Sequence, residues 1–218
     1  WLPDGAGIPR KPGDLFCPSP EVEALIGQAP VAYPHPDAWR QLDEPVRTAL
    51  GFRGVNDVRL TDVLEHIERS RARRVPVLLR VYEWMERGME DGWLASGELQ
   101  AVASQPLICA DDGEFYEGAR VVGELAFRLF GAWRGYWERG AHRCPRLCRA
   151  LGITAEVRPR DVAAFLRELA DAAEAQGAES LLGSDPALPR MLLACYARLG
   201  ADEATRLVPR SKPVILAH

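Results

Sequence analysis

The chain has 218 residues, of which 47% are hydrophobic and 27% charged, so it holds enough apolar material for one large or two small domains. Its net charge of -4 at pH 7 excludes a general binder of nucleic acid or anionic membrane, which needs a basic surface. With no signal peptide and no apolar run of about 18 residues, we expect a cytoplasmic protein. Because the sequence starts at Trp1 without a methionine, we also expect it to be a fragment of a longer polypeptide.

The basic residues and the cysteines both have simple explanations. Only Lys11 and Lys212 are lysine among the 27 basic residues, and GC-rich coding explains this better than a selected arginine function. The cysteine count of five is odd, and no tight disulfide framework is visible. Reduced thiols in the cytoplasm fit this pattern best.

The first half of the chain predicts a β-hairpin, a short helix and two amphipathic helices. The hairpin falls near residues 1–17, where Asp4 and Gly5 suit a tight turn. A short helix follows over residues 43–51, with Pro45 in its first turn and Gly51 as its C-cap. The next helix carries an apolar stripe after Asp62, which complements the helix dipole in the first turn.

The last helix of this half is predicted over residues 75–88. Its pattern places Leu78 and Tyr82 four residues apart on one face. Both amphipathic helices need partners to bury their stripes.

The second half repeats these elements in the same order. A hairpin is predicted near residues 106–117, a Pro- and Gly-bounded helix over 143–152, and an apolar stripe after Asp161. Leu192, Leu193 and Tyr196 then match Leu78, Leu79 and Tyr82. The extra length of this half falls in residues 173–187, which are small and polar and predict a loop.

These matches predict a mainly α fold (α+β) with small β-hairpins, made of two tandem diverged copies of a hairpin–short helix–two-helix unit. The predicted organisation is copy one over residues 1–90, a linker helix over 91–105 and copy two over 106–200. Residues 201–218 would be a tail or the start of a third unit, since their last residues resemble a strand.

A dense aromatic segment offers a candidate for partner binding. Trp133, Tyr136 and Trp137 fall within a few residues of Phe130. Such a cluster either fills a core, which is the simpler interpretation, or forms an exposed anchor for a protein partner.

The search for catalytic, cofactor and metal motifs gives no site. The phosphate-binding, dinucleotide-binding, metalloprotease and nucleophile-elbow motifs are missing from the sequence. His142, Cys144 and Cys148 are the best metal candidates, but no fourth ligand is evident, and the acids at 111–114 suit a solvated turn. We therefore expect no catalytic residue, no metal and no cofactor. His35 and His66 have no nucleophile beside them in the sequence, and His66 is expected to face out of its helix.

The order of "LP…DG", "ALG", "DVL" and "LLxxY" resembles the regions that follow the ATPase domain in sacsin-type proteins. The resemblance spans most of residues 1–200. It implies a helix-rich, repeat-like and non-catalytic segment of a very large protein, whose ATPase fold is shared with gyrase, histidine kinases and heat-shock ninety chaperones. The ATPase signatures of that family are absent here, so no catalytic residue is carried over.

Two classes of function follow. The first is a protein-interaction or scaffold segment of a larger ATP-dependent protein, chaperone-like or defensive. Its partner would be a client protein or the ATPase domain of the same polypeptide. The alternative is a stand-alone enzyme, or a module that binds a small ligand, with no recognisable motif.

Overall fold

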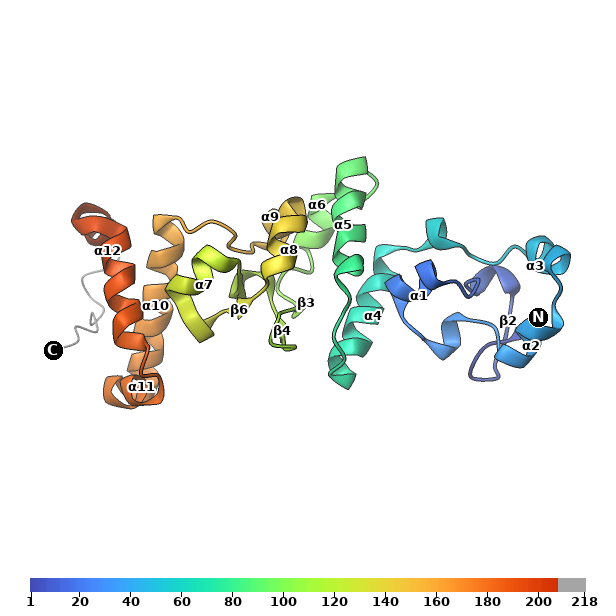
Figure 1. The fold of residues 1–218 in the computed structure, drawn as a ribbon, viewed down its shortest axis with the longest axis horizontal. Helices are drawn as coiled ribbons and strands as arrows, with labels where there is room; N and C mark the ends of the chain where they lie inside the picture. Colours follow the sequence, from blue (N-terminus) through green and yellow to red (C-terminus); the bar gives the residue numbers. More distant parts are fainter. Residues whose placement is uncertain (208–218) are drawn as a thin grey trace. The chain divides into compact units, whose positions relative to one another are not determined.

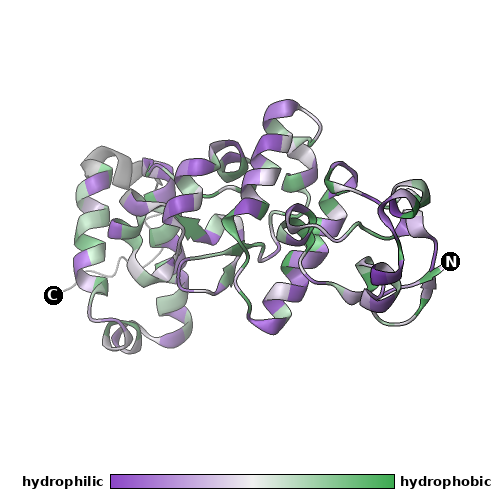
Figure 2. Ribbon diagram, turned by 45° about the vertical axis from the view of Figure 1, so that its right-hand side comes forward, coloured by the Kyte–Doolittle hydropathy of each residue, from purple (hydrophilic) through white to green (hydrophobic). Residues whose placement is uncertain are grey.

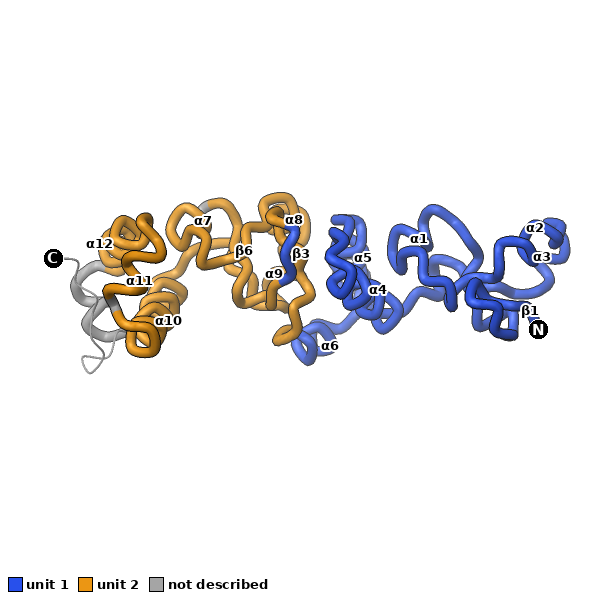
Figure 3. The backbone as a smooth tube through the Cα atoms, turned by 90° about the horizontal axis from the view of Figure 1, so that it is seen from below, with its two compact units in different colours: residues 1–102, 113–115 blue, residues 103–112, 116–218 orange. Residues whose placement is uncertain are grey.

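We describe residues 1–207 in a computed structural model, except for the side chains of Leu125, Ala178 and residues 200–207. The fold is mainly helical, with 62% helix, twelve helices and small two-stranded sheets in the described part (Figure 1). This confirms the predicted class of a mainly α fold with small β elements. The chain divides into two compact units, residues 1–102 with 113–115 and residues 103–112 with 116–218 (Figure 3).

Unit 1 begins with an antiparallel hairpin of β1 (Leu2–Pro3) and β2 (Pro9–Arg10). The buried Asp4 organises its turn, because its Oδ1 accepts hydrogen bonds from the N–H groups of Ala6 and Ile8, both at 2.9 Å. Burial alone would raise the pKa of Asp4, but hydrogen bonds from the Ile8 N–H and the Arg10 side chain outweigh it, so the pKa is lowered. The hairpin is therefore fixed by a buried carboxylate.

Helices make up most of the remainder of unit 1. They are α1 (Pro20–Ile26), α2 (Pro36–Gln41), α3 (Glu44–Leu50), α4 (Leu60–Arg73), α5 (Leu79–Asp91) and α6 (Ser96–Gln100). Three 3-10 turns separate them, η1 (Pro12–Asp14), η2 (Pro30–Ala32) and η3 (Val55–Asp57). The short α3 matches the predicted helix, with Pro45 in its first turn and Gly51 left-handed at its end.

The core of unit 1 forms where α1 packs against α4 and α5. Val63 and Ile67 of α4 are buried as predicted, and Tyr82 of α5 is 1% exposed. The predicted pairing of Leu78 with Tyr82 is wrong, because Leu78 is the N-cap of α5 and is 60% exposed. The helix therefore begins at Leu79, and Val81 is buried in the core together with Tyr82.

The second half of the chain contains the other two small sheets and six helices, and all of them belong to unit 2 except Phe115, which falls in unit 1. The sheets pair β3 (Ile108–Cys109) with β4 (Phe115–Tyr116), and β5 (Val121–Val122) in parallel with β6 (Gly135–Tyr136). The helices are α7 (Glu124–Phe130), α8 (Glu138–Arg143), α9 (Pro145–Leu151), α10 (Pro159–Gln176), α11 (Ala178–Ser184) and α12 (Leu188–Leu207). The 3-10 turns are η4 (Gly118–Arg120) and η5 (Gly131–Trp133).

The core of unit 2 lies among α7, α10 and α12. The predicted stripe of α10 is confirmed, since Val162, Phe165, Leu166 and Leu169 are all buried. Hydrophilic and hydrophobic residues share most helices, as amphipathic packing requires (Figure 2). In α12, Leu192 is buried with this stripe.

Residues 173–187, predicted as a loop, contain the end of α10 and the whole of α11. Alanine, glutamate and leucine are good helix formers, and Gly177, with φ of 86°, marks the break between the two helices. Helix α11 also has a packing role, because Leu181 is 2% exposed in the core. The prediction gave too little weight to the helix propensity of this segment.

At the predicted linker and tail, the structure describes short stretches of helix. The linker range 91–105 contains α6, and residues 201–207 belong to α12. The predicted strand of a third unit lies in 208–218, outside the described residues. None of the helices in residues 1–207 combines the length and apolar character that a membrane span requires.

Candidate interaction site

Two hollows in unit 2 that share the lining residue Glu156 are the candidate site. One, of about 650 Å³, lies between α9 and the start of α10, and the other, of about 540 Å³, lies between α7 and α12. We call the two hollows together the Glu156 groove. Its lining residues are Arg128, Leu129, Pro145, Cys148, Arg149, Gly152, Ile153, Thr154, Ala155, Glu156, Val157, Arg158, Arg160, Asp161 and Arg198.

The loop from Gly152 to Arg158 holds the groove open. Gly152 ends α9 in the left-handed conformation with φ of 75°, where a glycine avoids the steric cost of a Cβ. Thr154 then pairs in parallel with β5, donating its N–H to the Val121 carbonyl oxygen at 3.1 Å. The loop ends where Arg158 donates its N–H to Asp161 Oδ2 at 3.0 Å, which caps α10. Both ends of the loop are thus fixed by hydrogen bonds.

The charge of the groove is opposite to that of the chain. Five arginines and two acids line it, whereas the whole chain carries -4. Asp161 pairs with Arg158 at 3.4 Å and lies 3.8 Å from Arg160. Arg149 is exposed to solvent, so an external anion can reach its guanidinium group.

Apolar side chains form the floor of the groove. Leu129, Ile153 and Val157 line it, together with Cys148, which is 2% exposed. This combination of an apolar floor and a charged rim is typical of a binding surface for protein segments.

The predicted aromatic site lies in and beside the core of unit 2. Trp137 is 4% exposed, so its ring is not available to an external partner, and core packing explains it. Trp133 donates its Nε1–H to Asp185 at 2.9 Å, and Tyr136 stacks on Phe127 with ring centroids 4.7 Å apart. Both rings are half-buried by these contacts. Neither lines the Glu156 groove.

The candidate metal ligands do not form a cluster. Cys144 and Cys148 are buried, while His142 is exposed on the last turn of α8. Among the side chains that the structure describes, no three of histidine, cysteine or acidic type are placed to share a metal ion. None of the five cysteines, all of which are described, forms a disulfide.

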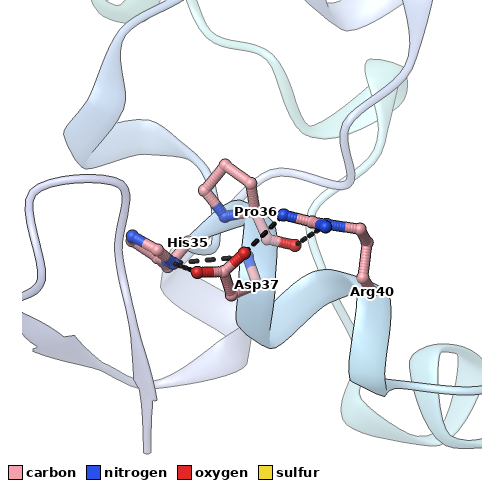
Figure 4. A network of polar contacts seen from close by, with 4 residues as sticks. All are labelled: His35, Pro36, Asp37 and Arg40. Atoms are coloured by element: carbon pink, nitrogen blue, oxygen red, sulfur yellow. Dashed lines mark hydrogen bonds and ion pairs between the residues drawn. The ribbon is translucent and has the colours of Figure 1, made fainter.

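His35 caps a helix. Its Nδ1 accepts a hydrogen bond from the Asp37 N–H at 3.3 Å, at the start of α2. Arg40, one turn later, bonds to Asp37 and to the Pro36 carbonyl oxygen (Figure 4). The side-chain contacts of this group are local to one short helix, as an N-cap requires, while the backbone N–H of His35 donates to the Pro3 carbonyl oxygen at 2.8 Å.

His66 was expected to face solvent, and this was wrong. Its ring is half-buried against the end of α1, where a Cβ on Gly27 would lie 2.6 Å from the ring. Burial, with the charge of Arg69, lowers the pKa of His66 below its usual value of 6.5. The imidazole packs here because Gly27 has no side chain, a pairing that sequence spacing alone does not reveal.

Comparisons with known proteins assign no family to this chain. It matches no family model, and no curated protein or solved structure shows significant similarity to it. Function is therefore inferred from the two units and the Glu156 groove.

Proposed function

We propose that the chain is a non-catalytic protein-interaction or scaffold segment, built from two diverged copies of one structural unit. The observation that carries this proposal is the order of elements. Apart from η3 in the first half of the chain and β5, β6 and α11 in the second, each half runs through a hairpin, a 3-10 turn, a short helix, a second 3-10 turn, two further short helices, a capped helix and a long helix. Tandem helical units of this kind present surfaces that bind proteins by shape.

Backbone pairing supports the correspondence of the two copies. In unit 1, Arg53 donates its N–H to the Leu15 carbonyl oxygen at 2.9 Å and accepts from the Cys17 N–H at 2.8 Å. In unit 2, Thr154 makes the same two bonds with Val121 and Gly123, both at 3.1 Å. Arg53 and Thr154 each lie two residues after the glycine that ends a short helix. The same parallel bridge thus recurs at the same place in each unit.

The two hairpins also support the correspondence of the two copies, but they align with a shift from the alignment that the sequence predicted. The sequence match aligned Asp4-Gly5 with Asp112-Gly113. The glycine with positive φ is instead Gly7 in the first hairpin, at 82°, and Gly113 in the second, at 83°. The proposed alignment therefore moves by two residues, so that Gly7 corresponds to Gly113.

We further propose that this segment belongs to a sacsin-type polypeptide with an ATPase domain elsewhere. The partner would then be a client protein or that ATPase domain. The reading frame of the parent protein tests this directly, since a gyrase-type ATPase domain should be encoded in it.

Binding measurements test the interaction function itself. A labelled, reduced and alkylated protein that cannot fold should bind residues 1–218 saturably in fluorescence anisotropy, while titration calorimetry with ATP should give no binding heat. Saturable binding of ATP, or turnover of it, would contradict the proposal and favour an enzyme. Failure of the unfolded protein to bind, together with failure of the ATPase domain to bind, would remove the interaction function.

A further inference from the structure

We propose that the Glu156 groove binds an acidic segment of a partner protein in an extended conformation. This inference rests on the proposed interaction function and names the chemistry of the partner. Two features carry it: five arginines against two acids line the groove, and apolar side chains line it as well.

The loop beside the groove differs between the two units. In unit 1, the guanidinium of Arg53 pairs with Asp62 at 2.8 Å and donates to the Asp57 carbonyl oxygen at 2.7 Å. In unit 2, the short side chain of Thr154 follows the short helix at the same spacing and lines the larger hollow.

The rim selects for negative charge. Arg149 and Arg160 border the larger hollow, and Arg128 and Arg198 border the smaller one. Arg160 is 68% exposed, so its guanidinium can turn toward a ligand at little cost. Arginine binds carboxylates in a bidentate geometry, and complementary charge increases both specificity and association rate.

The shape favours a peptide over a small anion or a nucleic acid. Arginines and apolar side chains line both hollows, with Leu129 and Val157 in the smaller one and Ile153 in the larger one. A single anion can satisfy the arginines of one hollow only, whereas an acidic peptide can place carboxylates in both hollows and apolar side chains against these residues. Single-stranded nucleic acid relies on aromatic platforms for its bases, and no aromatic ring is among the described residues that line this groove.

The probe is a labelled peptide in which glutamate and aspartate alternate with leucine and alanine. Its controls are the same peptide with each acid replaced by its amide, and a single-stranded RNA of equal length. The acidic peptide should bind at least about tenfold more tightly than the amide peptide, and this advantage should shrink at high salt.

Variants locate the site. Arg149→Glu and Arg160→Glu should each weaken the acidic peptide about tenfold, since each reverses a charge on the rim. Arg167→Glu makes the same change on an exposed position of α10 outside the groove and should leave binding within about twofold. Thr154→Arg should place the side chain of Arg53 in the larger hollow and abolish binding, with an unchanged thermal midpoint as the folding control.

The outcomes separate this inference from the proposed function. Equal binding of acidic and amide peptides, equal effects of Arg149→Glu and Arg167→Glu, or tighter binding of RNA would each overturn the inference. If the unfolded protein binds residues 1–218 but the acidic peptide does not, the inference fails and the interaction function stands. If neither binds and the ATPase domain also fails to bind, both fail.

Discussion

Helices α4 and α10 begin in the same way and then bury different faces. Asp62 accepts a hydrogen bond from the Arg59 N–H at 2.9 Å, and Asp161 accepts one from the Arg158 N–H at 3.0 Å. Four residues after each aspartate, however, α4 has the half-buried His66 and α10 has the fully buried Phe165. The cap fixes where a helix starts, whereas its buried face follows the elements that pack on it.

The loops that precede these two helices also differ, in the side chain that follows the short helix. Arg53 reaches Asp62 and closes the first loop, with its guanidinium 4.0 Å from the centre of the Phe16 ring. Thr154 leaves the second loop open as part of the Glu156 groove. A charged side chain thus ties the first loop to its helix, whereas the second loop lines a hollow.

The largest expected effect on stability comes from the buried apolar face of α10. Phe165→Ala should lower the free energy of unfolding by about 3–5 kcal/mol, because the ring is fully buried and contacts Phe130. His66→Ala is the matched change in α4 and should cost about 1 kcal/mol, since its ring is only half-buried. Urea denaturation of both variants measures the difference. Equal losses would show that the two faces carry similar packing energy.

The ion pair between Arg53 and Asp62 should have an intermediate effect on stability. Arg53→Thr copies unit 2 into unit 1 and should cost about 1–2 kcal/mol, since it removes charged hydrogen bonds that are only partly exposed. Asp62 should keep its bond to the Arg59 N–H, so α4 should still begin at the same residue. Denaturation gives the energy, and backbone NMR shifts report the helix start. A stability unchanged from the wild type would contradict a structural role for this ion pair.

A smaller effect is expected from pH. The pKa of His66 is lowered in the folded state, so the unfolded state binds a proton more readily. Stability should therefore fall as the pH drops below about 6.5, with the loss complete once the folded pKa is passed. His66→Gln should remove this part of the pH dependence in thermal scans. A decline of the same size in the variant would assign the effect to other groups.

The smallest effects should come from the two exposed leucines that the repeat pattern singled out. Leu78 is 60% exposed and Leu193 is 68% exposed. Leu78→Ala and Leu193→Ala should each change the free energy of unfolding by less than about 0.5 kcal/mol. Leu192→Ala, at a site 4% exposed, is the buried control and should cost about 2–5 kcal/mol.

Local signals in the sequence predicted the helical class, the hairpin positions and the capped starts of α4 and α10. Proline, glycine and aspartate act within one turn, so their effects can be seen without tertiary contacts. The phase of α5 and the burial of His66 depend on α1, which is distant in sequence, and no local pattern could supply them. The Glu156 groove was missed because it is lined by residues of α7, α9, α10 and α12 that are distant in sequence.

Hydrogen exchange in the presence of the acidic peptide tests the central claim, that unit 2 binds a partner where unit 1 is closed. Amides of residues 145–161 should become protected on peptide binding, while those of residues 45–62 should exchange as before. Protection of the unit 1 segment, or peptide binding with no change in residues 145–161, would contradict the account.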